Sequence, residues 1–108
     1  MKPPEQLTEL AVAGDKNALE QLIISVQDMI YNLALRMLWH PEDAKDDTQE
    51  ILIKVITNLS SFENKSEFKT WVYRLSTNTL INFKKRLQNK QLSFDEYSNY
   101  LIQGLSND

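Results

Sequence analysis

The sequence predicts an all-α fold, a compact bundle of three main helices with a short helix before them. Three observations support this prediction. Only two glycines, Gly14 and Gly104, occur in 108 residues, so few positions break a helix. Leu, Glu, Lys, Gln and Ala, which all favour helix, are common. Apolar residues recur at steps of three and four, and no stretch shows the sustained alternation of a strand.

The first two helices are expected on either side of Gly14. A short helix covers Glu5 to Ala13 and ends at this glycine. Asp15 suits the N-cap of the second helix, which runs close to Trp39. The stripe expected to face the core consists of Leu19, Leu22, Ile23, Val26, Ile30, Leu33, Ala34, Met37 and Leu38.

The third helix is expected to begin at His40-Pro41. Proline suits the first helical position, and Glu42 and Asp43 suit the positive end of the helix dipole. The single histidine is expected to be structural or exposed. The buried face of this helix is predicted to consist of Ala44, Thr48, Ile51, Leu52, Val55, Ile56 and Leu59.

The fourth helix follows a polar connection over residues 60–65 and is expected to end near Leu87 or Asn89. Ser66 suits its N-cap, and both tryptophans of the chain are expected in the core. Residues 1–89 thus form one helical domain, and residues 90–108 form a linker or tail with at most a weak helix. The inner face of the fourth helix is predicted to contain Phe68, Trp71, Val72, Leu75, Thr79, Phe83 and Leu87.

The net charge of −3 conceals a strong segregation of charge. Residues 1–50 contain four Lys/Arg and ten Asp/Glu, a net charge of −6. Residues 51–90 contain eight Lys/Arg and two Asp/Glu, a net charge of +6. This asymmetry favours a nucleic-acid partner for the basic part and a different partner for the acidic part.

Several classes of protein are disfavoured. The chain has no cysteine, which excludes disulfides and thiolate zinc sites. No apolar run approaches the roughly 20 residues of a membrane span, and the N-terminus lacks a secretory signal. We therefore expect a cytoplasmic protein with no membrane partner. No Ser-His-Asp set, phosphate-binding glycine loop or metal-spaced cluster appears, so no enzyme, cofactor or metal site is expected.

Acidic side chains concentrate at the start of the third helix. Asp43, Asp46, Asp47 and Glu50 have the spacing i, i+3, i+4 and i+7, which predicts that they gather on one side. A solvated helix face is the ordinary interpretation of this cluster. A carboxylate metal site is another. The functional interpretation is a docking surface for a basic partner, made of Asp43, Asp46, Asp47, Gln49, Glu50 and Ile53.

Basic and amide side chains concentrate on the fourth helix and in the connection before it. Lys and Arg contact phosphates, and asparagine hydrogen-bonds base edges. A loop with one aromatic side chain among polar groups can hold an unstacked base. A solvated face and a simple connection are the ordinary interpretations. The candidate nucleic-acid-binding residues on the helix are Lys69, Arg74, Asn78, Asn82, Lys84, Lys85 and Arg86, and the candidate loop covers residues 61–66.

Three stretches of this chain resemble extracytoplasmic-function (ECF) sigma factors. The residues from Asp43 to Val55 resemble the family's DAEDLVQEVFLKV stretch. The residues from Phe68 to Asn78, with 84–86, resemble its FxTWLYRIARN…RR stretch, and residues 14–19 resemble its GDxxAF opening. The three matches stand in the family's order across residues 10–87, and their combination is far more specific than any one of them.

The resemblance implies a sigma region 2-like domain with two partners. The acidic helix, through Asp46, Gln49, Glu50 and Ile53, would bind the clamp helices of the β′ subunit of RNA polymerase. The loop and last helix would recognise the promoter −10 element as a single non-template strand, with one base flipped into a pocket of the loop. For this DNA-binding role the resemblance points to Phe62, Asn64, Lys65 and Ser66 in the loop and to Arg74 and Asn78 on the helix, with Lys84, Lys85 and Arg86 at phosphates. An anti-sigma factor that uses the same surfaces is a further expected partner.

The chain departs from the family pattern at several points. Lys45 replaces a usual acid, Asp47 replaces a usual apolar residue, and Asn82 stands where aspartate is common. The family's C-terminal helix-turn-helix domain, which reads the −35 element, is missing. We therefore expect a piece of a longer protein, whose linker begins near residue 92, with a one-domain protein as the alternative.

Three other interpretations remain open. The first is a helical interaction module that a regulator binds without direct DNA recognition. The second is a small helical enzyme that uses the acidic cluster with a metal. The third is a duplex-binding helix-turn-helix protein, which the length of the last helix and the lack of a short turn between short helices disfavour.

Overall fold

The structure of the chain is a computed structural model that describes the backbone of residues 4–64 and 66–106 and the side chains of residues 5–64 and 66–90. Over this part, the elements are α1 (Pro4–Val12), α2 (Lys16–Leu38), α3 (Pro41–Asn58), the 3-10 turn η1 (Leu59–Ser61) and α4 (Phe68–Ser106). No strand occurs among the described residues. The predicted all-α fold is confirmed.

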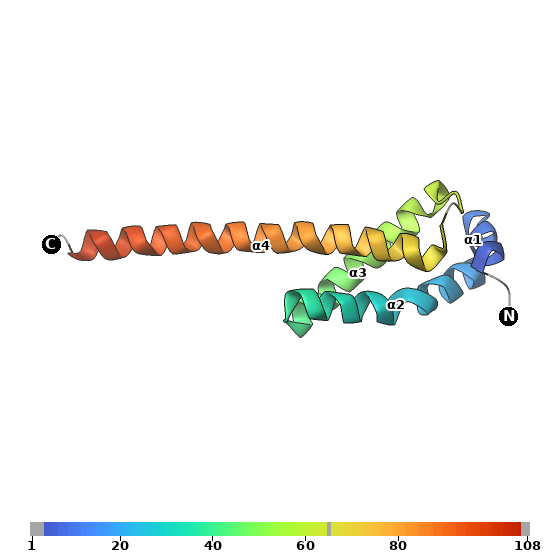
Figure 1. The fold of residues 1–108 in the computed structure, drawn as a ribbon, viewed down its shortest axis with the longest axis horizontal. Coiled ribbons are helices and arrows are strands. Elements are labelled where there is room, and N and C mark those ends of the chain that lie inside the picture. The colour runs from blue at the N-terminus through green and yellow to red at the C-terminus, as the bar shows by residue number, and fades with distance from the viewer. Residues whose placement is uncertain (1–3, 65, 107–108) are drawn as a thin grey trace.

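The central helix of the bundle is α2, which contacts α1, α3 and α4. Figure 1 shows α2 and α4 side by side and running in the same direction, with α3 crossing behind them and α1 at one end. The second half of α4 projects beyond the bundle, so the molecule measures 71 × 23 × 21 Å. One end of α4 is therefore packed on other helices, and the other end is not.

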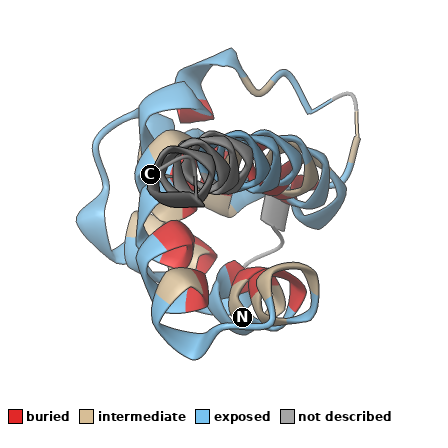
Figure 2. Cartoon of the chain, turned by 90° about the vertical axis from the view of Figure 1, so that its left-hand side faces the viewer, coloured by how far each residue is buried: buried red, intermediate tan, exposed pale blue. Residues whose placement is uncertain are grey.

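The core lies where α2, α3 and α4 meet, and the red segments of Figure 2 mark its buried positions. Burial of these apolar side chains is the main force that holds the helices together. The stripe predicted on α2 is confirmed at its centre, because Leu22, Val26 and Ile30 are fully buried. The largest fully buried apolar side chains from the other two helices are Ile51 and Val55 on α3 and Val72 and Leu80 on α4.

The predicted helix starts are confirmed for α2 and α3. Asp15 caps α2, and its side chain accepts a hydrogen bond from the backbone N–H of Ala18 at 3.1 Å. Gly14 has φ +104°, a conformation that L side chains rarely adopt, which explains why a glycine separates α1 from α2. Pro41 occupies the first turn of α3, after His40 at the N-cap.

Two predictions about the boundaries of α4 are wrong. Its first backbone bond runs from the N–H of Trp71 to the carbonyl of Glu67 at 3.0 Å, so Glu67 and not Ser66 occupies the N-cap position. The helix also continues to Ser106 and does not end near Leu87 or Asn89. The physical reason is that residues 88–106 contain no proline and a single glycine, so nothing local terminates the helix.

Several predictions about the core are also wrong. Trp39 is 87% exposed and Ile56 is 40% exposed. On α4, Ser76 and Leu80 are buried although they were not expected in the core, and Leu87 is exposed. Leu87 is the midpoint of α4, and the second half of this helix projects beyond the bundle (Figure 1). The Ser76 hydroxyl is accommodated because it donates to the Val72 carbonyl of its own helix at 2.7 Å.

Candidate functional site

The outer side of α3 carries a surface of acidic, amide and apolar side chains. Asp46, Gln49 and Glu50 are exposed, and Asp43 is half-buried. Ile53 is 61% exposed, as the sequence predicted from its position off the buried stripe. We call Asp43, Asp46, Gln49, Glu50 and Ile53 the docking surface. It combines negative charge with one apolar side chain on a rigid helix.

Asp47 does not belong to this surface, so the prediction that it gathers there with its acidic neighbours is wrong. Its side chain is 2% exposed and lies on the same helix face as the buried Ala44 and Ile51. Its Oδ2 atom has no hydrogen-bond partner. Burial, and then the nearby charge of Glu50, raises the pKa of Asp47 to about 6, against a smaller opposing effect of Arg86.

The position of Asp47 in the fold explains its departure from the family pattern. The resembling stretch has an apolar residue here, and the structure places this position inside the bundle. A buried carboxylate with an oxygen that lacks a hydrogen-bond partner is energetically unfavourable. Asp47 is therefore a poorly accommodated core residue and not a surface contact.

The outer side of α4 carries a row of exposed polar and basic side chains. Arg74, Asn78 and Asn82 follow one another at four-residue intervals, so they lie on one face of the helix. Lys85 continues this row. Residues 68–90 contain six Lys/Arg and no Asp/Glu. We call Arg74, Asn78, Asn82 and Lys85 the α4 row.

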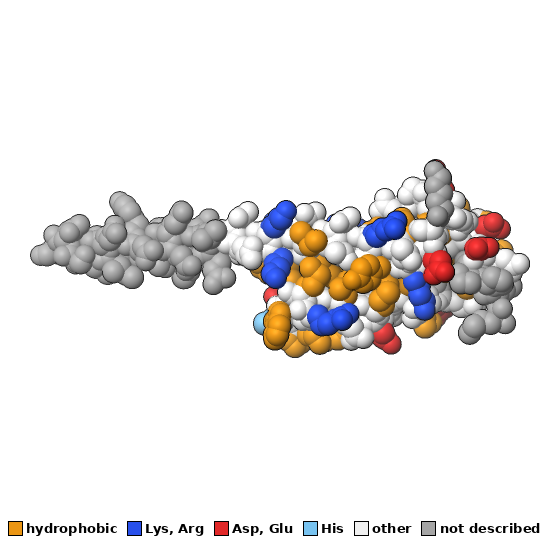
Figure 3. Space-filling model, in the orientation of Figure 1, with side chains coloured by type: hydrophobic (Ala, Val, Ile, Leu, Met, Phe, Trp, Pro, Cys, Tyr) orange, Lys and Arg blue, Asp and Glu red, His pale blue; other side chains and the backbone are white. Residues whose placement is uncertain are grey.

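The remaining basic candidates on α4 are exposed but lie around the row and not in it. Lys84 and Arg86 flank Lys85 on its two sides, and the Arg86 guanidinium lies 5.7 Å from the centre of the Phe83 ring. Lys69 is five residues before Arg74, which turns it about 140° away around the helix. Figure 3 shows Lys and Arg side chains spaced along α4 on the face that it displays.

An aromatic cluster joins the α3–α4 connection to the start of α4. The ring of Phe62 lies 5.2 Å from that of Trp71 and 6.0 Å from that of Phe68, edge-on to the latter. Phe62 and Trp71 are half-buried, and both pack against the core. The prediction that Trp71 is a core residue is confirmed. Phe62 is held against α4, so the connection and the helix present one continuous surface.

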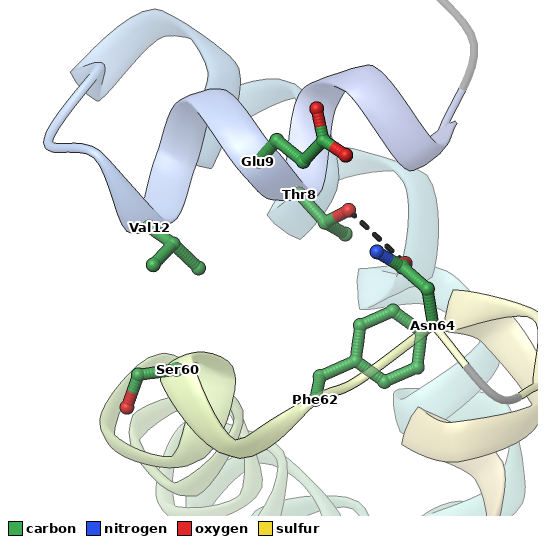
Figure 4. Close-up of a pocket in the computed structure, with 6 residues that line it drawn as sticks. All are labelled: Thr8, Glu9, Val12, Ser60, Phe62 and Asn64. Carbon is green, nitrogen blue, oxygen red and sulfur yellow. Dashed lines mark hydrogen bonds between the residues drawn. The ribbon is translucent and has the colours of Figure 1, made fainter.

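The connection also packs on α1, where it encloses a pocket of about 250 Å³. Figure 4 shows Thr8 and Val12 of α1 on one side of this pocket and Phe62 and Asn64 on the other. Glu9 and Ser60 complete its lining. The buried Thr8 hydroxyl donates to the Glu5 carbonyl at 2.7 Å and lies 3.4 Å from Asn64 Oδ1. Asn64 is exposed and has φ +57°, a conformation that asparagine tolerates.

Two of the predicted pocket residues, Phe62 and Asn64, therefore line this hollow, and Ser66 is half-buried outside it. Lys65 lies outside the described residues. The contribution of α1 was not predicted, because no local pattern indicates that Thr8 packs next to a residue 56 positions later. Only the tertiary fold brings these segments together.

Two further observations concern the described part of the chain. Its residues contain no group of three or more His, Cys, Asp or Glu side chains that is arranged to hold a metal ion. Among its helices, none is long and apolar enough to cross a membrane.

Comparison with known proteins gives consistent matches. The model of the family described as sigma-70 region 2 matches residues 22–90. The ECF RNA polymerase sigma factor SigW of Bacillus subtilis is 38% identical over 69 residues, which cover 64% of this chain and 37% of that protein. The RNA polymerase sigma-H factor of Pseudomonas aeruginosa is 37% identical over 78 residues, which cover 72% of this chain and 40% of that protein.

A third relative extends the match along most of the chain. The ECF RNA polymerase sigma-E factor of Haemophilus influenzae is 32% identical over 105 residues, which cover 89% of this chain and 55% of that protein. The chain thus spans about half, or less, of the length of these relatives. The family match includes all of α3, the connection and the first part of α4, and leaves α1 outside.

Proposed function

This chain belongs to the family of sigma-70 region 2 domains of the ECF group, and from that premise we propose that it joins RNA polymerase to promoter DNA during transcription initiation. The docking surface binds the clamp helices of the β′ subunit. The α4 row and the α3–α4 connection bind the −10 element as a single non-template strand. In this proposal the chain works by positioning its two partners.

The docking surface supports the first part of the proposal by its charge and its exposure. Glu50 and Asp46 are carboxylates that complement a basic protein surface, and Gln49 supplies both a donor and an acceptor. Ile53, at 61% exposure, is an apolar group that water solvates poorly and that a partner can cover. All of these side chains project from one packed helix, so little ordering is needed when they bind.

The α4 row supports the second part of the proposal. Lys85 and Arg74, with the flanking Lys84 and Arg86, provide positive charge for phosphates, and no acidic residue of α4 before position 91 opposes it. Asn78 and Asn82 place amide groups between these charges, where bases of the same strand would lie. A single strand exposes the base edges that such amides recognise.

The pocket between α1 and the connection is the site that we assign to a flipped base. It lies beside Phe62, whose ring belongs to the aromatic cluster at the start of α4. The exposed Asn64 amide at its rim can hydrogen-bond the edge of a base. A strand that follows the α4 row would reach this pocket through the connection.

The observation that carries the proposal is the placement of an acidic and a basic surface on two helices of one packed bundle. A domain of this kind can hold a protein with one helix and a nucleic acid with another. The few phosphate contacts that α4 offers give weak DNA binding alone, since each contributes about 0.7 to the salt dependence on single strands. Binding to polymerase supplies the remaining affinity by raising the effective concentration of DNA.

Capture of the chain by a β′ clamp-helix fragment tests the docking surface. The double variant Gln49→Ala, Glu50→Arg should abolish capture, because it removes an amide and reverses a charge at the centre of the surface. Glu20→Arg is the matched control, since Glu20 is an exposed acid on a different helix, α2. Capture of the double variant at the wild-type level would refute the docking assignment.

Binding of single-stranded −10 oligonucleotides in the presence of polymerase tests the α4 row. Asn78→Ala should flatten the base preference at one position of the strand, by about 1–3 kcal/mol of discrimination. Asn32→Ala, an equivalent change of an exposed asparagine on α2, should leave every preference unchanged. If Asn78→Ala also leaves every preference intact, the recognition role of the row is wrong.

A further inference from the structure

Trp39 combines two features that are each unfavourable for a large apolar residue. Its side chain is 87% exposed, although an indole is among the groups that gain most from burial. Its backbone has φ +58° and ψ +19°, in the left-handed region. Bulky residues are rare there, and the residue that ends a helix in this way is usually glycine.

The fold gains little from the indole. The end of α2 is closed by the backbone N–H of Trp39, which donates to the Leu35 carbonyl at 3.0 Å. Any residue other than proline can make this bond. Among the described side chains, the ring contacts and the cation–π contact involve Phe62, Phe68, Trp71, Phe83 and Arg86, and not Trp39. Packing within the bundle therefore does not explain why a tryptophan occupies this position.

Trp39 lies next to the acidic start of α3. It directly precedes His40, whose Nδ1 atom is 3.7 Å from a carboxylate oxygen of Asp43, the first residue of the docking surface. Glu42 and Asp46 of the same helix are exposed. Figure 1 shows the α2–α3 turn at the end of the bundle, near the point where α4 projects from it. Through His40, the position of Trp39 therefore adjoins the Asp43 end of the docking surface, and exposed carboxylates follow it on α3.

We propose that Trp39 is a hydrophobic anchor of the docking surface and inserts into an apolar pocket on the basic polymerase surface that this docking surface binds. The inference rests on the proposed function. Two observations select this occupant. Through His40, Trp39 adjoins the Asp43 end of the docking surface, and the carboxylates at the start of α3, which outnumber the one cation in the last turn of α2, Arg36, complement a basic protein and repel the phosphates of a nucleic acid. Tryptophan is among the residues most enriched in hot spots, the few residues that contribute most of the binding energy of a protein interface.

The test is the affinity of the chain for core polymerase, measured together with its melting temperature. Trp39→Asn should weaken binding at least about tenfold. The same substitution should leave the Tm unchanged or raise it, because asparagine tolerates the left-handed conformation better than tryptophan. Trp39→Phe should retain most of the affinity, since it keeps an aromatic ring. A purely structural role for Trp39 would instead lower Tm and affinity together.

Ile24→Asn is the matched control, since Ile24 is 63% exposed and lies about 22 Å before Trp39 along α2. It should bind polymerase as the wild type does. If the wild type binds and Trp39→Asn binds equally well, the anchor is wrong and the docking surface stands. If Trp39→Asn weakens only the capture of −10 oligonucleotides, Trp39 contacts DNA and the anchor is also wrong. If the wild type itself does not bind, the proposed function fails and the anchor fails with it.

Discussion

The acidic start of α3 and the basic part of α4 look alike in the sequence, because each concentrates one sign of charge on a helix. The structure separates them. The α3 segment packs in the bundle, and one of its four clustered carboxylates, Asp47, is buried. The α4 segment approaches the end of the bundle, and Lys84, Lys85 and Arg86 are all exposed. A charge pattern therefore predicts a surface reliably only where the helix has no neighbour on that side.

The largest expected effect is at Asp47, because substitution of this residue removes the buried charge that distinguishes the α3 segment from the α4 segment. Asp47→Leu replaces a buried carboxylate, whose Oδ2 atom lacks a hydrogen-bond partner, with the apolar type of residue that the family pattern has there. We expect the free energy of unfolding at pH 7.5 to rise by up to about 3 kcal/mol, the equivalent of the pKa displacement. Urea denaturation followed by circular dichroism measures this change.

Asp46→Leu is the control for Asp47→Leu. Asp46 is exposed on the same helix, and a surface substitution there should change stability by only about 0.5 kcal/mol. Equal effects of the two substitutions would mean that helix propensity and not burial determines the change in stability. That result would contradict the difference between the buried and the exposed side of α3.

The same residue predicts a dependence of stability on pH. The pKa of Asp47 is about 6 in the folded chain, against an ordinary value of 3.8. The folded state therefore binds this proton more tightly than the unfolded chain, and the stability contribution falls as pH rises from 3.8 to 6. The stability advantage of Asp47→Asn over the wild type should be near zero at pH 4 and reach its maximum above pH 7. An advantage that does not vary with pH would contradict burial of an ionising group.

On α4, neutralising two exposed charges tests whether the basic segment contacts phosphates. Lys84→Gln with Lys85→Gln should reduce the slope of log affinity against log salt by about 1.4, at about 0.7 for each phosphate contact. The measurement is binding of the polymerase complex to single-stranded −10 oligonucleotides at several salt concentrations. Lys16→Gln with Arg36→Gln removes the same charge from exposed positions on α2 and should leave the slope unchanged. A decrease that is equal in both double variants would indicate only a general field effect.

The helices and most of the core could be predicted from the sequence because they depend on local periodicity. Val26 and Ile30 on α2 and Ile51 and Val55 on α3 are buried as their spacing indicates. Trp39 and Asp47 could not be predicted, because in each case residue type and environment disagree. An apolar ring is exposed, and a carboxylate is buried. Rules based on whether a residue type is usually buried or exposed fail at such positions. These positions are the most informative about function or strain.

The candidate site divides in the same way. The α4 row follows from four-residue spacing on one helix, so the sequence was sufficient for Arg74, Asn78 and Asn82. The pocket depends on contacts between α1 and the α3–α4 connection, such as that between Thr8 and Asn64, which are 56 residues apart. A single sequence contains no periodic signal for such a contact.

The smallest expected effect concerns how α2 and α3 begin. The Asp15 carboxylate caps α2 at 3.1 Å, whereas at α3 the imidazole of His40 accepts from the N–H of Asp43 at 3.4 Å, a long hydrogen bond. His40→Asn should raise the free energy of unfolding by about 0.5–1 kcal/mol, because asparagine is a favoured N-cap. Asp15→Ala should lower it by about 1 kcal/mol and provides the scale. If His40→Asn instead lowers the free energy of unfolding, the imidazole stabilises the fold by more than capping α3. Its contact with the Asp43 carboxylate at 3.7 Å would then be the interaction responsible.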